Sequence, residues 1–194
     1  INGKWNIGGG FMFNTSIDTL GNWNINTMTD INYKHDVGYL TLQNAVGPQK
    51  NSTNNTSIGE RLSFSYRNDW LEVEPNGSFT YTHARNKLQS NSDLDTWQYS
   101  YGLNVNITSP WGTSLSTNVS ENCRRGYNDA SMNTNEFIWN AQISQSFLRG
   151  RPLTVSLQFY DILKNQSNFS RAINAYNRTD TWYNSINSYA MLKV

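Results

Sequence analysis

The sequence has one cysteine, four prolines and few charged residues among its 194 positions. Cys123 alone cannot close an internal disulfide or form a multi-cysteine zinc site. Charged residues make up 15% of the chain, against about a quarter in ordinary globular domains, which argues against a highly charged disordered chain. The net charge of +1 gives no basic footprint, so no nucleic-acid partner is expected. No apolar run reaches the ~18 residues that a transmembrane helix needs. This criterion does not detect the strands of a membrane barrel, whose apolar residues alternate with polar ones.

Neutral side chains supply the polarity instead, and aromatic residues reach 13%. Apolar and polar residues alternate in many segments, for example Leu62–Tyr66, Leu103–Ile107 and Leu153–Phe159. A period of two places apolar groups on one face of a sheet and polar groups on the other. The sequence therefore predicts an all-β chain.

Short and long connections alternate between these segments. Short turn signals lie at 18–22, 67–69, 109–112 and 148–152, and longer polar stretches at 38–57, 88–95, 124–134 and 165–179. About nine antiparallel strands are predicted, near 4–15, 22–37, 57–67, 70–87, 95–108, 111–123, 134–147, 152–164 and 180–194. All exceed the ~5–6 residues usual in soluble proteins and suit tilted membrane strands. Short periplasmic turns and long extracellular loops are typical of transmembrane β-barrels in the bacterial outer membrane.

The tryptophans are predicted at strand ends, in two sets at opposite edges of the sheet. One set follows short turns, and the other lies near the beginnings of strands that follow long loops or of the first strand. The first set is Trp23, Trp70 and Trp111, and the second is Trp5, Trp97, Trp139 and Trp182. Amphipathic indoles at both rims predict aromatic girdles at the two membrane interfaces. Packing in the core of a soluble sandwich is the alternative, and it would favour strand middles.

The predicted strand count indicates a part of a barrel. An odd number of strands that begins and ends with inward-running strands does not describe a complete bacterial barrel, and an open sheet would leave unpaired edges in lipid. The chain also opens at Ile1, without an initiator methionine or a signal segment. We therefore expect residues 1–194 to be the C-terminal portion of a larger outer-membrane barrel.

Several segments resemble a known family. They are WNAQISQSFL at 139–148, the stretch 153–163, QSNFSR at 166–171 and the closing YAML at 189–192, with RRGY at 124–127 and THARNKL at 82–88. Together they look like the C-terminal barrel region of Bacteroidota TonB-dependent receptor-like outer-membrane proteins. The resemblance covers most of the chain, is weakest at 38–57, and is most specific in YDILKNQSNFSR at 160–171.

The resemblance implies a barrel of about 22 strands, a plug domain inserted from the N-terminal side, and energy drawn from the inner membrane through TonB. The chain departs from the family pattern in two ways. The plug, the TonB-contacting segment and the earlier strands are absent from it, and its final strand stops at Val194, where relatives continue into an aromatic-ended closing strand.

Three residues of a predicted extracellular loop are candidate ligand contacts. Arg124, Arg125 and Tyr127 combine guanidinium groups with an aromatic ring, which suits an anionic or sugar ligand. The alternative is that this cluster only contacts lipopolysaccharide or caps the loop.

The remaining polar motifs favour structural roles. Glu72 and Glu74 lie two apart on one strand, whereas a glycosidase pair flanks its substrate across a gap, normally from different strands. His35 and His83 have no cysteine or acidic cluster at metal-ligand spacing. No enzymatic activity, metal site or cofactor is predicted.

The resemblance implies nutrient uptake across the outer membrane, as part of a TonB-dependent receptor-like transporter. One alternative is a structural barrel scaffold that docks surface lipoproteins in an envelope complex, and another is a soluble secreted carbohydrate-binding β-sandwich. Expected partners are outer-membrane lipid and lipopolysaccharide, TonB through the missing N-terminal part, and a surface lipoprotein. The sequence does not identify the cargo.

Overall fold

The computed structural model describes residues 3–41, 46–89, 93–128, 130–147, 153–166, 169–173, 178–184 and 186–194. Its strands are β1 (Trp5–Ser16), β2 (Trp23–Leu40), β3 (Gln49–Arg67), β4 (Leu71–Asn86), β5 (Leu94–Thr108), β6 (Thr113–Arg125), β7 (Asn135–Ser146), β8 (Thr154–Tyr160), β9 (Phe169–Ile173), β10 (Arg178–Trp182) and β11 (Tyr189–Lys193). A 3₁₀ turn, η2 (Ala130–Met132), precedes β7. Among the described residues, no helix is long and apolar enough to cross a membrane.

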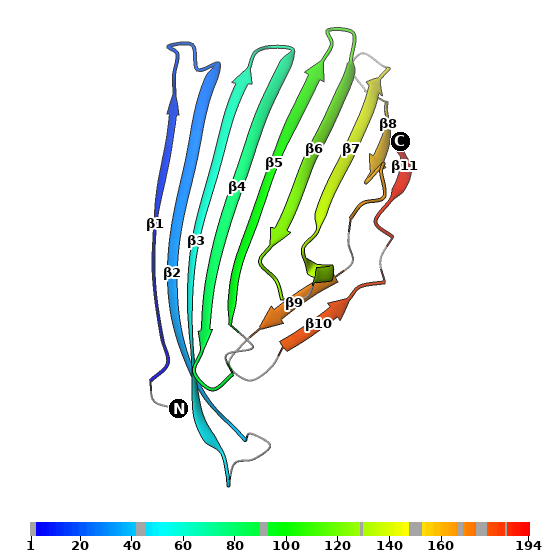
Figure 1. The fold of residues 1–194 in the computed structure, drawn as a ribbon. Coiled ribbons are helices and arrows are strands. Elements are labelled where there is room, and N and C mark those ends of the chain that lie inside the picture. Colours follow the sequence, from blue (N-terminus) through cyan, green and yellow to red (C-terminus); the bar gives the residue numbers. More distant parts are fainter. Residues whose placement is uncertain are drawn as a thin grey trace.

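Nine strands form one antiparallel sheet in the order β1-β2-β3-β4-β5-β6-β7-β8-β11, and β9 and β10 form a separate hairpin. Figure 1 shows this sheet as a single curved layer, with β1 at one edge and β11 at the other. The short connections lie together at one end of the strands, and the long connections lie at the opposite end. The predicted antiparallel all-β fold is confirmed.

The strand register separates the side chains into two faces, because directly paired residues of antiparallel strands share a face. The row Ile31, Ile58, Tyr81 and Trp97 belongs to what we call the apolar face. The row Glu74, Asn104, Asn118 and Asn140 belongs to the opposite, polar face.

Exposure in this sheet is the reverse of that in a soluble domain. Among the described residues, the buried hydrophobic side chains are only Val37, Ala84, Cys123 and Met132. In contrast, large side chains of the apolar face are open, such as Phe11 at 63%. An exposed apolar face of this extent requires lipid or protein to cover it.

The short turns are closed by local polar side chains. Asp18 accepts hydrogen bonds from the backbone N–H groups of Trp23 (2.9 Å) and Asn22 (3.1 Å). The bond from Trp23 is the main cause of a lowered pKa for the Asp18 carboxyl group. Asn68 plays the same part in the next short turn, where its Oδ1 accepts from the N–H groups of Trp70 and Leu71. The bond from Trp70 to Asn68, two residues apart, forms an Asx turn, which needs few residues and keeps this connection short.

Two predicted boundaries near the β2–β3 connection are wrong. β2 continues to Leu40 and β3 begins at Gln49, so much of the predicted loop 38–57 is paired strand. The segment 49–57 is rich in Asn, Ser and Thr and has no apolar alternation, so its side chains gave no strand signal. Backbone pairing with β2 extends the ladder regardless. This β2–β3 ribbon projects beyond its neighbour, because pairing of β3 with β4 starts only at Thr53.

The C-terminal region also differs from the prediction. β8 ends at Tyr160, before the expected 164, because Asp161 and Lys164 take positive φ angles of 43° and 60°. Asp161 is 1% exposed, and its carboxylate accepts from the backbone N–H groups of Asn165 and Gln166. The predicted strand 180–194 is divided between β10 and β11, and the predicted loop 165–179 contains β9. The turn signal at 148–152 lies outside the described residues.

Both outer edges of the sheet are open. β1 pairs only with β2, and β11 pairs only with β8, among the described strands. An open edge is not stable in hydrocarbon, because its backbone N–H and C=O groups have no water to replace a strand partner.

Candidate functional site

The polar face is a wall of neutral hydrogen-bonding side chains. Cross-strand bonds join Ser78 to Ser100 (2.8 Å) and Ser114 to Ser144 (2.6 Å). A bond of 2.7 Å runs from Gln158 Nε2 to Gln142 Oε1. This regular pairing of polar groups follows from the period-two pattern, which places every second residue on this face.

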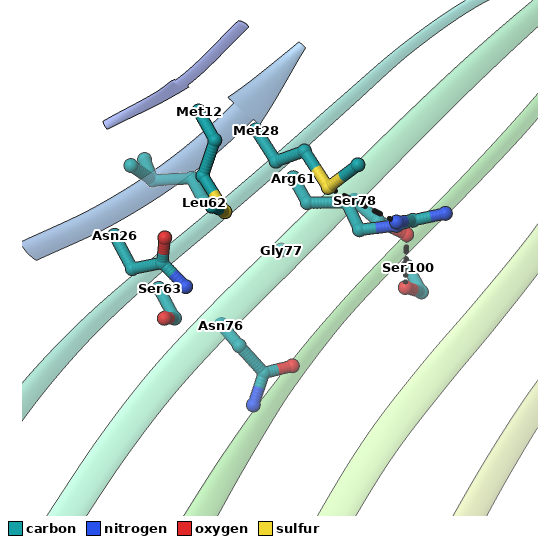
Figure 2. A pocket seen from close by; sticks show the side chains of 10 residues that line it. All are labelled: Met12, Asn26, Met28, Arg61, Leu62, Ser63, Asn76, Gly77, Ser78 and Ser100. Carbon is teal, nitrogen blue, oxygen red and sulfur yellow. Dashed lines mark hydrogen bonds between the residues drawn. The ribbon is translucent and has the colours of Figure 1, made fainter. Parts of the chain in front are cut away.

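A hollow of about 360 Å³ opens on this face near the first strands of the sheet. Residues from β1 to β5 line it (Figure 2): Met12, Asn26, Met28, Arg61, Leu62, Ser63, Asn76, Gly77, Ser78 and Ser100. Its volume falls within the range of small-molecule pockets. A smaller hollow of about 120 Å³ lies farther along the same sheet, between residues of β6, β7 and β8.

Arg61 brings the positive charge to the larger hollow. Its described polar contact is a weak hydrogen bond from Nη1 to the sulfur of Met28, at 3.6 Å (Figure 2). The side chain is exposed, and within the described part of the chain it forms no ion pair with a carboxylate. Sequence reasoning missed this residue, since a single arginine in a polar strand carries no motif.

Several other charges of the polar face form ion pairs. Arg67 forms an ion pair with Glu72, and Lys34 lies 2.7 Å from a carboxylate oxygen of Asp36. Glu72 is therefore held by an arginine of the neighbouring strand. Glu72 and Glu74 share the polar face of β4 with asparagines opposite both of them.

The candidate loop residues lie where β6 ends and the following connection begins. Arg124 and Arg125 are the last residues of β6. The guanidinium of Arg125 donates to the carbonyl oxygens of Arg124 (2.7 Å) and Thr134 (3.1 Å). Tyr127 accepts a hydrogen bond from Gln98 at 2.6 Å. Arg125 thus caps backbone carbonyls of this connection, and ligand binding by the three residues stays a prediction.

The seven tryptophans lie in three kinds of structural position. Trp5, Trp23, Trp97 and Trp139 stand on strands of the apolar face, Trp70 and Trp111 lie in short turns, and Trp182 lies in β10, outside the nine-stranded sheet. All are exposed by more than a third. Trp5 and Trp97 pack against Tyr33 and Tyr81 of neighbouring strands, with ring centroids 4.8 and 5.5 Å apart. The girdles themselves stay a prediction.

A charged cluster at the long-connection end was not predicted. Asp95 of β5 accepts from Tyr81 (3.0 Å) and from the Nδ1 of His83 (2.6 Å) with one oxygen, and from Arg85 (2.7 Å) with the other. The four residues share the apolar face, because β4 and β5 pair with His83 opposite Asp95. The cluster joins two strands across a long connection. Within the described residues, no group of three His, Cys, Asp or Glu side chains is arranged to hold a metal ion.

These features define a class of protein before any comparison is made. Long antiparallel strands with one exposed apolar face and one hydrogen-bonded polar face form the wall of a membrane β-barrel. A family model described as an outer membrane protein β-barrel family matches residues 43–193, and the chain belongs to this family. The protein is therefore a barrel protein of the bacterial outer membrane. No curated protein and no solved structure matches the chain.

Proposed function

We propose that the protein forms part of a TonB-dependent receptor-like transporter that carries a nutrient across the outer membrane. The observation behind the proposal is the polar face, which offers neutral hydroxyl and amide groups with most charges paired. Such a lumen wall hydrogen-bonds a polar solute without holding it by strong charge. The resemblance of residues 139–171 to TonB-dependent receptor-like proteins supports the same function.

The open edges support a larger barrel. β1 and β11 each need another strand beside them in lipid, so the sheet is proposed to be an arc of a larger barrel, for which the resemblance implies about 22 strands. In this arrangement a plug domain is inserted into the barrel, TonB is contacted through a segment outside this chain, and lipid and lipopolysaccharide cover the apolar face. Catalysis is not part of the proposal, because Glu72 is tied to Arg67 and Glu74 faces a row of asparagines.

Uptake by living cells tests the proposal. Strains with and without the full-length gene are grown in complex medium, and the compounds depleted from the medium are compared by mass spectrometry. We expect at least one polar solute to be depleted only by the strain that carries the gene, and a protonophore to stop that depletion. Identical depletion by both strains, or depletion that a protonophore leaves unchanged, would contradict energised transport.

A scaffold that docks a surface lipoprotein is the second candidate. The projecting β2–β3 ribbon favours it, because residues 37–40 and 49–52 extend the sheet beyond β4 at the long-connection end. Deleting this projection tests the scaffold. Loss of a co-purifying lipoprotein with solute depletion unchanged would favour docking over transport.

A further inference from the structure

We propose that the hollow around Arg61 is a binding site for the carboxylate group of a small polar solute. The proposal deepens the proposed function, on which it rests for its biological use, by naming a ligand class at the lumen wall. Binding itself requires only that the polar face be open to water, so it is measured without transport.

The guanidinium of Arg61 has the donors for this ligand. An arginine carries five N–H donors in a planar fork that matches the two oxygens of a carboxylate. Its described contact, to the sulfur of Met28, uses one donor on a weak acceptor. An ionisable side chain within a membrane barrel normally pairs or faces water, and Arg61 has no carboxylate partner among the described residues.

The lining of the hollow suits a hydroxylated solute. Ser78 and Ser100 bring hydroxyl groups bonded to each other at 2.8 Å, and each hydroxyl can still accept or donate to a ligand. Asn76 lies two residues from Ser78 on the same face of β4 and also lines the hollow. Met12 and Met28 add flexible apolar surface that adapts to the shape of a ligand. The hollow thus combines one cation with neutral groups that fix orientation.

Asp30 limits the strength of this site. It lies on the polar face of β2 opposite Gly59, while Arg61 lies opposite Met28, so the two charges are diagonal neighbours. The Asp30 carboxylate lies over the bare backbone of Gly59 and makes no ion pair with Arg61 within 4.0 Å. A bound carboxylate would be repelled by Asp30, so removal of that charge should tighten binding.

Arg67 provides a matched control on the same strand and face. It lies six residues from Arg61 in β3, and its charge is already taken by Glu72. The same Arg→Gln substitution therefore removes, at one position, a cation that has no carboxylate partner among the described residues and, at the other, a paired one.

The experiment measures binding to the full-length protein, purified from outer membranes in detergent. The probes are glucuronate and glucose, because they differ in a carboxylate at one carbon. We expect glucuronate to bind at least tenfold more tightly than glucose, and Arg61→Gln to abolish that preference. Arg67→Gln should leave it unchanged, Asp30→Asn should raise glucuronate affinity severalfold, and added salt should weaken it. Arg61→Lys, which keeps the charge but not the fork, should retain part of the preference.

Three results would overturn the proposal. The first is equal binding of the two probes by the unaltered protein. The second is an equal loss of glucuronate binding in Arg61→Gln and Arg67→Gln. The third is absence of binding together with increased ion conductance of Arg61→Gln in planar bilayers, which would mean that Arg61 holds a polypeptide inside the lumen. Heat-modifiable migration on gels verifies that each variant is folded.

Discussion

On the apolar face, neighbouring strands meet through side chains such as Ile31 and Ile58 that also face lipid, whereas on the polar face they meet through directed bonds such as that between Ser114 and Ser144. Apolar contacts are non-directional, so many registers would satisfy them. Hydroxyl and amide pairs require specific partners. The comparison teaches that lipid contact selects which face points outward, while the polar face adds specificity to strand register.

Each face contains an exception that tests this division. Glu60 lies on the apolar face of β3, where it accepts hydrogen bonds from the hydroxyl groups of Thr27 and Thr29. Met12 and Met28 lie opposite each other on the polar face. Glu60 is satisfied by its neighbours, and the two methionines line the hollow around Arg61. The exceptions are thus local groups with their own contacts.

The largest effect on the free energy of unfolding is expected from a charge placed at the middle of β6. Val119 is on the apolar face and Ser120, its neighbour, is on the polar face. Val119→Arg should lower the free energy of unfolding in lipid vesicles by about 2–4 kcal/mol, because an arginine facing the bilayer centre is poorly solvated. Ser120→Arg should change it by no more than about 0.5 kcal/mol, since its side chain reaches water. Urea unfolding of the full-length protein in vesicles measures both, and equal losses would mean that the faces are wrongly assigned.

The division into two faces was available from the sequence, because alternation at 62–66 and 103–107 is a local signal. The pairing of His83 and Arg85 with Asp95 was not, since it depends on the length and path of a connection between two strands. Residues 49–57 were not predicted as a strand, because a strand made of polar residues shows no alternation of apolar and polar side chains. Asp161 also escaped, although it lies in the most specific motif, because its role depends on backbone N–H groups that only the folded turn brings to its carboxylate.

Removing a carboxylate should have a smaller effect on stability in vesicles, and the sign should be opposite on the two faces. Glu60→Leu should raise the urea midpoint in vesicles, because it replaces an acid in the lipid-facing band by an apolar side chain. Glu72→Leu should lower the midpoint slightly, because Arg67 loses its ion-pair partner. A falling midpoint for Glu60→Leu would show that protein, and not lipid, covers this part of the apolar face.

The smallest effect is expected from adding a methyl group to each face. A Cβ at Gly9, on the apolar face of β1, would meet no atom within 4 Å, whereas one at Gly59, on the polar face of β3, would lie 2.6 Å from an Asp30 carboxylate oxygen. Gly9→Ala should raise the free energy of unfolding by about 0.5 kcal/mol, because alanine loses less backbone entropy on folding. Gly59→Ala should lower it by about 1 kcal/mol, since Asp30 must move.

The Gly9 and Gly59 substitutions also test the binding site at Arg61. When Asp30 is pushed from its place over Gly59, its charge shifts relative to Arg61, so Gly59→Ala should change glucuronate affinity while Gly9→Ala leaves it unaltered. Titration with glucuronate, carried out beside the urea series, measures this. If Gly59→Ala neither lowered the free energy of unfolding nor changed glucuronate affinity, the Asp30 carboxylate would not lie over the backbone of β3. The side chains around Arg61 would then have room to accommodate the added methyl group.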